Sequence, residues 1–241
     1  MSWYAKPYGG YTMRSTEGTA NIFEIHYMLE RAGYTIESQA GIIGNMYHES
    51  ALNPWRWQGD SVNEYYGGYG LFQYTPSSNG GRDRYIGTCE GLPYYAPSMS
   101  TSYVSAGAKA TDAICQVNVF IDDYLSKWVS SLWRSYWPDN QSLRNYCNNI
   151  LSTYGSGYSL SQYQFSQIDD VTAAAVAFLG CFEGPAVPNA GPRIDAAAEA
   201  YEIITGAPPD PGPTPDSGGG NTPSSTSKMP IWLMLKPYWK R

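Results

Sequence analysis

The amino-acid sequence predicts an α+β fold that is predominantly α-helical, followed by a segment that cannot form a packed core. Up to residue 206, apolar residues recur mainly at the three- and four-residue spacing of amphipathic helices. The strand signal is weak and is confined to roughly residues 65–74. From residue 207 the composition shifts to proline, glycine, serine and threonine. We therefore expect one globular domain in residues 1–206, which is long enough to bury a sizeable core.

One helix is expected to run from Thr35, a suitable N-cap, to about residues 50–52. Apolar residues follow the cap at helical spacing, namely Ile36, Ala40, Ile43 and Tyr47. Pro54 disfavours helical geometry at the residue before it, so the helix should end there. Gly41 and Gly44 lie in its middle, where each glycine weakens a helix by up to about 1 kcal/mol relative to alanine. Their presence predicts that another element packs closely against that face.

Glu49 lies in the last turn of this helix, and the functional hypothesis depends on it. With Ile42 and Met46 it forms a stripe, so its carboxyl group should project beside apolar side chains. Burial disfavours the charged form of a carboxyl group, and the negative end of the helix dipole adds to that effect. An acid that keeps its proton near neutral pH can serve as the general acid of a glycosidase. The alternative is a solvated glutamate at a helix end, which is the commoner case for any single glutamate.

The segment that follows favours the catalytic interpretation. Residues 67–76, Gly-Gly-Tyr-Gly-Leu-Phe-Gln-Tyr-Thr-Pro, form a glycine-rich, aromatic turn with Gln73 between bulky residues. Aromatic residues make up 15% of the chain, and several of them crowd the region around Glu49. Tyrosine and tryptophan suit carbohydrate clefts because a flat apolar face can stack on a sugar while the polar edge forms hydrogen bonds.

Beyond this turn the sequence predicts mainly helices. In chain order they are expected at residues 109–132, 143–151, 171–182 and 193–205. Asp169 or Asp170 can cap the third of these helices, and Gly206 can close the last. The apolar faces of these helices are explained by packing in a core.

The four cysteines, Cys89, Cys115, Cys147 and Cys181, are too widely spaced for a zinc ribbon. The last three lie within helical patterns, which predicts buried free thiols. A disulfide remains open, since pairing cannot be read from the sequence.

Other chemistries receive little support. His26 and His48 form neither His-x-x-x-His nor His-x-His, so the usual zinc peptidase signatures are absent and no metal or other cofactor is expected. His48 is expected to point away from Glu49, because adjacent helical residues face different directions. The chain has no Gly-x-Ser-x-Gly motif of an esterase and no phosphate-binding loop. A net charge of −6 argues against nucleic acid as a partner.

Several motifs occur together in a fixed order. They are Trp3-Tyr-Ala-Lys with Gly9-Gly-Tyr11, Gly44-Asn-Met with Glu49-Ser50 and Asn53-Pro54, Gly68-Tyr-Gly-Leu with Gln73, and Phe182-Glu-Gly-Pro185. In this order the chain resembles the phage tail lysozyme family, which belongs to the lysozyme superfamily and includes wall-degrading proteins of bacteriophage tail tips. The resemblance spans most of residues 1–206.

This resemblance implies a lysozyme-like fold and cleavage of peptidoglycan between N-acetylmuramic acid and N-acetylglucosamine. Glu49 matches the catalytic glutamate of the family. Gln73, with Tyr69 and Tyr74, matches the turn that lines the sugar-binding cleft. The enzyme would be a glycoside hydrolase (a muramidase) or a lytic transglycosylase. Two other classes stay open, a non-catalytic glycan-binding module and a structural tail-tip protein.

A second catalytic carboxylate is not evident from the sequence. Asp60 and Glu64 are the nearest candidates, and Glu64 is more readily explained as a solvent-facing or capping charge. Lytic transglycosylases of the superfamily work with one glutamate, so either mechanism is compatible with the chain. Glu183 matches a recurrent Glu-Arg-Pro of the family, but Gly184 replaces the arginine here. We therefore expect Glu183 to be a structural or outer-cleft residue, without a charge pair to position 184.

The C-terminal part should be separate from the enzyme domain. Residues 207–228 are expected to form a flexible linker. Residues 229–241 are aromatic and locally basic, and they are shorter than the roughly 20 apolar residues that span a bilayer. Such a segment can insert at a membrane interface, dock onto another subunit or pack back on its own domain. Of these alternatives we favour docking onto phage tail proteins. The N-terminus lacks a basic region followed by an apolar run, so we expect no secretion signal; the protein would be carried on the virion or held in the host cytoplasm until lysis.

Overall fold

The computed structural model describes residues 3–6, 8–60, 68–74, 106–123, 141–157, 159–185 and 187–206. The described helices are α1 (Thr16–Arg31), α2 (Ile36–Ser50), α4 (Ala106–Asp123), α6 (Gln141–Thr153), α7 (Gln162–Ser166), α8 (Val171–Phe178) and α9 (Ala190–Thr205). Two short turns join them, the 3₁₀ turn η1 (Gln58–Asp60) and the π-helical turn η4 (Leu179–Glu183). The predominantly α-helical fold class predicted from the sequence is confirmed.

The predicted β region is reduced to single bridges in the described residues. Tyr69 forms antiparallel bridges with both Trp57 and Tyr74, and no longer strand occurs in the part of the chain that the structure describes. Residues 65–67, at the start of the expected region, lie outside the described residues. The glycine-rich turn is therefore a tight loop that two bridges hold in shape.

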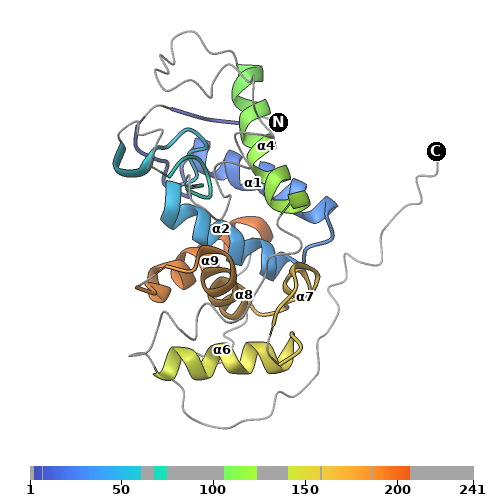
Figure 1. Ribbon diagram of the computed structural model, residues 1–241. Coiled ribbons are helices and arrows are strands. Elements are labelled where there is room, and N and C mark those ends of the chain that lie inside the picture. Colours follow the sequence, from blue (N-terminus) through green and yellow to red (C-terminus); the bar gives the residue numbers. More distant parts are fainter. Residues whose placement is uncertain are drawn as a thin grey trace, which may run out of the picture.

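Helix α2 lies in the middle of the molecule and packs against α8 and α9 (Figure 1). Its boundaries follow the local signals in the sequence. The Thr35 side chain accepts a hydrogen bond from the Ser38 amide, which caps the helix start. The helix ends at Ser50, and Ala51 adopts a left-handed conformation with φ of 48°. The end predicted from Pro54 is thus confirmed.

The two glycines of α2 mark its closest contacts with other helices. A Cβ atom on Gly41 would lie 2.6 Å from the carbonyl carbon of Ala174 in α8. One on Gly44 would lie 2.5 Å from the amide nitrogen of Ala197 in α9. Both distances are far below normal contact, so the helix backbones approach as closely as the sequence predicts. This approach brings the C-terminal half of α2 against two other helices.

The helix expected at residues 171–182 is only partly regular. Asp170 caps α8 as predicted, through a hydrogen bond from the Ala173 amide to its side chain. After Phe178 the chain widens into the π-helical turn η4, which ends at Gly184 with φ of 54°. A helical repeat in the sequence does not distinguish an α-helix from a π-turn, because an extra residue in one turn leaves most of the apolar spacing intact.

The other expected helices agree with the structure where it describes them. Helix α9 ends at Gly206, with φ of 71°, and α6 covers the expected residues 143–151. Helix α4 covers the first part of the expected helix at 109–132, and residues 124–132 lie outside the described residues. No helix within the described segments is both long and apolar enough to cross a membrane.

The cysteines agree with prediction in two of the three helical cases. Cys147 and Cys181 are buried free thiols, as expected. Cys115 is disulfide-bonded, so the expectation of a free thiol at this position is wrong. A disulfide requires two cysteines to lie close together in the folded chain, and the helical spacing of apolar residues does not predict which cysteines do so.

A cluster of phenylalanine rings fixes the glycine-rich turn against the helices. The Phe72 ring of the turn lies 5.2 Å from Phe120 of α4 and 5.5 Å from Phe182 of η4, measured between ring centroids. Phe178 and Phe182 are themselves 4.6 Å apart. The turn, α4 and the end of η4 therefore share one apolar core, and their polar residues can be held at fixed positions beside it.

The close contact at Gly44 can be tested by adding one methyl group. Gly44→Ala should lower the free energy of unfolding by about 1–3 kcal/mol, because its methyl group would overlap the backbone of α9. The matched control is Gly191→Ala in α9, where a Cβ atom would meet nothing within 4 Å. That variant should be neutral, or more stable by up to about 1 kcal/mol. Urea unfolding measures both changes, and equal stabilities of the two variants would contradict the close approach.

Candidate active site

A pocket of about 230 Å³ lies between the C-terminal end of α2 and the glycine-rich turn. Its lining residues are Glu49, Arg56, Gln58, Gly59, Gly68 and Gln73. Two residues that the sequence assigns to the site, Glu49 and Gln73, thus face the same pocket. Among the described lining residues, Glu49 supplies the carboxylate.

Glu49 is paired with a buried arginine. Nη2 of Arg193, in the first turns of α9, lies 2.5 Å from Oε1 of Glu49. The Arg193 side chain is 5% exposed and the Glu49 side chain 21% exposed, so the carboxylate lies at the edge of the pocket and the guanidinium behind it. The ion pair therefore joins the end of α2 to the start of α9.

Asn45 holds the guanidinium from the same face of α2, one turn before Glu49. Its Oδ1 accepts a hydrogen bond of 2.9 Å from Nη1 of Arg193. Its Nδ2 donates to the carbonyl oxygens of Gly41 and Ala175, which fixes the orientation of the amide. Asn45 is completely buried. The ion pair is therefore supported by residues of α2, α8 and α9.

The environment of Glu49 differs from the expected one in this respect. The sequence predicts a carboxyl group beside apolar side chains, and the structure adds a cation 144 positions further along the chain. Arg193 lies near the start of an alanine-rich helix, where a positive charge interacts unfavourably with the helix dipole. This unfavourable position is the one local sign in the sequence that Arg193 has a partner elsewhere. Such a residue is more readily explained by a tertiary partner than by the helix itself.

Glu183 belongs to the same charged cluster. Its carboxyl group lies close enough to Glu49 and Arg193 for both charges to act on it. Burial raises the pKa of Glu183 well above its usual value, the negative charge of Glu49 raises it further, and Arg193 opposes both effects. One oxygen, Oε1, is enclosed and accepts no hydrogen bond from the described residues. The positive charge that acts on Glu183 is thus that of Arg193 in α9. The sequence does not indicate that Arg193 and Glu183 influence each other.

Gln73 is fixed at the opposite side of the pocket. Its backbone has a positive φ of 48°, and its Nε2 donates hydrogen bonds of 3.0 Å to the carbonyl oxygens of Arg56 and Gly70. Ser50, next to Glu49, donates to the carbonyl oxygen of Leu71 and so ties the end of α2 to the turn. The distance between the two sides of the pocket is therefore set by direct hydrogen bonds.

Tyr69 and Tyr74 lie behind the pocket. Both side chains are buried, and neither is part of the lining. The Tyr69 hydroxyl donates to Oδ2 of Asp112, and the Tyr74 hydroxyl donates to the carbonyl oxygen of Gln116, both in α4. In this structure the two tyrosines support the turn from its core side.

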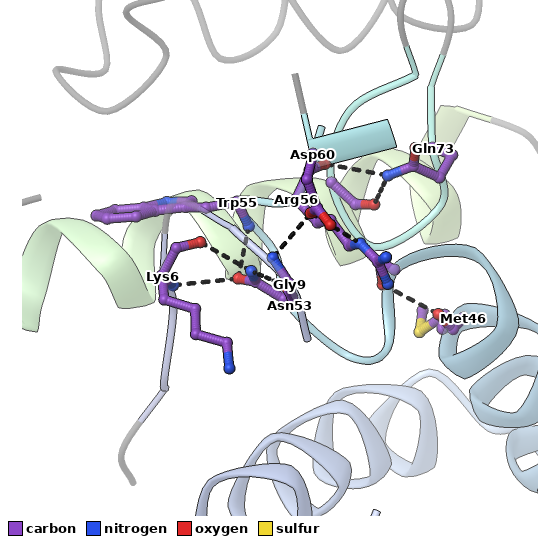
Figure 2. Close-up of polar contacts among 10 residues, drawn as sticks. Lys6, Gly9, Met46, Asn53, Trp55, Arg56, Asp60 and Gln73 are labelled. Atoms are coloured by element: carbon purple, nitrogen blue, oxygen red, sulfur yellow. Dashed lines mark hydrogen bonds and ion pairs between the residues drawn. The ribbon is translucent and has the colours of Figure 1, made fainter. Parts of the chain in front are cut away.

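Asp60 is engaged in the attachment of the N-terminal segment. Its Oδ1 accepts hydrogen bonds of 2.7 Å from the Gly9 amide and 3.3 Å from Nε of Arg56 (Figure 2). Asn53 bonds to the backbone of both Lys6 and Gly9 in the same view. The pocket lining includes Arg56 but not Asp60. Glu64, the other candidate in the sequence, lies outside the described residues.

The comparison with known families agrees with this geometry. The family profile described as phage tail lysozyme matches residues 21–204, which is most of the chain. The chain belongs to the phage tail lysozyme family. It is thus a lysozyme-like enzyme of the kind that degrades peptidoglycan, and the matched range contains every member of the charged cluster. Within the described residues, no three histidine, cysteine, aspartate or glutamate side chains are grouped as metal ligands would be.

The role of the buried ion pair in this family member can be measured by removing the cation. Arg193→Met should lower the free energy of unfolding by about 2–3 kcal/mol, because Glu49 and Asn45 lose a buried partner. The matched control is Arg14→Met, since Arg14 also pairs with two groups, Glu199 and Glu202, but its side chain is 60% exposed. That change should cost less than about 1 kcal/mol. Urea unfolding at pH 7 compares the two variants, and similar losses would show that the Arg193 pair has no special weight.

Proposed function

We propose that this protein cleaves the glycan strands of peptidoglycan between N-acetylmuramic acid and N-acetylglucosamine, with Glu49 as the general acid. The observation that carries the proposal is the position of Glu49, partly exposed in a polar pocket while its carboxyl group is held from behind. A general acid must reach the leaving oxygen within hydrogen-bond distance and must keep its orientation. The family to which the chain belongs supports wall glycan as the substrate.

The two oxygens of Glu49 have different surroundings. Oε1 accepts the hydrogen bond from Arg193, and Oε2 makes none with the described residues. We assign the donated proton to Oε2, because this oxygen is free to meet the glycosidic oxygen of a strand in the pocket. Orientation by Arg193 and Asn45 limits the rotation of the carboxyl group.

The opposite side of the pocket offers groups that can hold a sugar. The two amide protons of Gln73 are taken by backbone carbonyls, so its Oε1 is the atom available to accept from a sugar hydroxyl or an N-acetyl N–H. Gly68 leaves room for this group, since a Cβ atom there would lie 2.9 Å from Oε1 of Gln73. Tyr69 and Tyr74 would contribute indirectly, by holding the turn in place.

The second step of the reaction has two possible forms. A two-carboxylate hydrolase needs a base or nucleophile at about 5–9.5 Å from the acid, and Asp60 is the candidate from the sequence. The two hydrogen bonds accepted by its Oδ1 and its absence from the pocket lining favour a structural role instead. Internal attack by a sugar hydroxyl, as in a lytic transglycosylase, needs no second carboxylate. Hydrolysis leaves reducing ends and internal attack leaves 1,6-anhydro ends.

The place of action follows from the family. Membership among phage tail lysozymes supports a virion-associated enzyme that opens the wall during infection. We retain the proposal that residues 229–241 dock onto other tail proteins through the linker at 207–228. A glycan-binding module or a structural tail-tip protein would not need a carboxylate oriented at the edge of a polar pocket.

The central test replaces the acid by its amide. Glu49→Gln should lower the release of soluble fragments from purified cell walls by at least about a hundredfold, because glutamine cannot donate the required proton. Its amide oxygen can still accept from Arg193, so circular dichroism should show a folded protein. Asp60→Asn should retain most of the activity if Asp60 is structural. Turbidity measures the rate, and mass spectrometry of the products identifies reducing or 1,6-anhydro ends.

Equal clearing by wild type and Glu49→Gln would reject Glu49 as the acid. A wild-type protein that clears no walls but sediments with them would support the glycan-binding class, and one that does neither would support the structural class.

A further inference from the structure

Arg56 is a cation at the pocket that the proposed cleavage step does not use. It lines the pocket together with Glu49, and its side chain is 28% exposed. Glu49 is paired with a different arginine, Arg193, which lies behind the carboxylate. The whole chain carries a net charge of −6, so a positive group that faces a pocket stands out from the overall charge. Such a group attracts an anionic part of a ligand.

The backbone and the inner end of the Arg56 side chain are both held in place. Its carbonyl oxygen accepts hydrogen bonds of 2.9 Å from the Gly70 amide and 3.0 Å from Nε2 of Gln73. Its own amide donates a hydrogen bond of 3.1 Å to the carbonyl oxygen of Asn53. Its Nε donates to Oδ1 of Asp60 at 3.3 Å (Figure 2). The two Nη atoms, by contrast, form no hydrogen bond with the described residues.

The carboxylate that anchors Nε is positioned by an unusual backbone. Gly59 and Asp60 have positive φ values of 65° and 53°, and they bring Asp60 back toward Arg56 at the end of η1. A left-handed conformation is unfavourable for a residue with a side chain. At Asp60 it is held by the hydrogen bonds that Oδ1 accepts from the Gly9 amide and from Arg56. Backbone strain of this kind clusters at functional sites, where neighbouring contacts maintain it.

The anchored guanidinium has one edge left for a ligand. A guanidinium binds a carboxylate through two parallel hydrogen bonds, which its two Nη atoms can donate side by side. Because Asp60 contacts Nε, the edge formed by the two Nη atoms stays open. Two other lining residues, Gln58 and Gln73, are uncharged amides that do not compete for this edge as an anion would. The arrangement therefore favours a carboxylate over a neutral hydroxyl group.

We propose that the two Nη atoms of Arg56 bind a carboxylate carried on the lactyl side arm of N-acetylmuramic acid. The assignment rests on the proposed function, which supplies the glycan. N-acetylmuramic acid differs from N-acetylglucosamine by this side arm. Its carboxyl group is either free or linked to the stem peptide, and that peptide carries carboxylates of its own. Because the two sugars alternate, holding the arm at Arg56 determines which kind of glycosidic bond meets Glu49. Arg56 is thus a specificity-determining residue.

The test measures ligand binding by titration calorimetry in Glu49→Gln, which the proposed mechanism makes inactive. It uses three soluble, uncrosslinked ligands: strands without peptides, whose lactyl carboxylates are free, the same strands with these carboxylates converted to amides, and strands that keep their stem peptides. Adding Arg56→Met should raise the Kd of carboxylate-bearing strands at least about tenfold, because charge-assisted hydrogen bonds are lost. The Kd of the amidated strands should change by less than about twofold, because they offer the guanidinium no anion.

The three ligands also distinguish the two sources of the carboxylate. A loss of affinity confined to the peptide-free strands would assign the contact to the lactyl carboxylate itself. A loss confined to the peptide-bearing strands would assign it to the stem peptide. In either case Arg56→Lys should restore only part of the affinity, because an ammonium group cannot donate two parallel hydrogen bonds in a fixed plane.

The matched control is Arg14→Met in the same background. It also removes one positive charge and an arginine whose Nε contacts a carboxylate, but that pair, with Glu199, lies on the surface away from the pocket lining. Its Kd values should equal those of Glu49→Gln alone. Equal losses in Arg14→Met and Arg56→Met would show a general charge effect and would overturn the proposal. A loss in Arg56→Met that is as large for amidated strands as for carboxylate-bearing strands would overturn it as well.

A second comparison does not require the Arg56 variants to fold. With Arg56 intact, Glu49→Gln should bind at least one kind of carboxylate-bearing strand about tenfold more tightly than the amidated strands. Equal affinity for all three ligands would overturn the proposal. A wild type that clears no walls but shows this preference would reject the proposed cleavage and leave the carboxylate site supported. A wild type that clears walls without the preference would retain the cleavage and reject the site.

Discussion

The candidate site depends on the close packing of α2 against α9. Gly44 meets the backbone at Ala197, and Arg193 lies one helical turn before Ala197 on the same face of α9. Gly44 contacts Ala197, and Glu49, later in α2, contacts Arg193, which is earlier in α9. The two helices therefore run antiparallel. A larger side chain at position 44 would separate the helices and pull the guanidinium away from Asn45 and Glu49. The absence of a side chain at Gly44 thus sets the geometry of the Arg193–Glu49 pair at the pocket.

This packing brings charged groups of α2 and α9 together at the edge of the pocket. Glu49 is exposed enough to meet a substrate, whereas Arg193 and one oxygen of Glu183 are enclosed. The π-helical turn before Gly184 contributes by keeping Phe182 in the aromatic core next to the site. Catalytic potential and core packing therefore come from the same few residues.

The sequence predicts those features that local chemistry determines. Thr35, Pro54 and Gly206 mark helix ends because capping and backbone preferences act within a few residues. The glycines of α2 indicate a close contact, although not which helix makes it. The motifs around Glu49 and Gln73 identify two sides of one pocket.

Features that arise from distant residues could not be predicted in this way. The pairing of Glu49 with Arg193 joins residues 144 positions apart and depends on the register of two helices. The disulfide of Cys115 depends in the same way on a meeting of distant parts of the chain. An aromatic residue in a tight turn can point either toward the pocket or toward the core, and the sequence does not distinguish these directions. In the structure Tyr69 and Tyr74 both point toward α4.

The role of Glu49 as the acid is tested most directly by a crystal structure of Glu49→Gln with a bound oligosaccharide of alternating N-acetylglucosamine and N-acetylmuramic acid. If Glu49 is the acid, the glycan crosses the pocket between α2 and the glycine-rich turn, with the side chain of residue 49 about 2.6–3.2 Å from a glycosidic oxygen. A glycan bound elsewhere on the protein, or one whose glycosidic oxygens all lie beyond hydrogen-bond reach of residue 49, would contradict it.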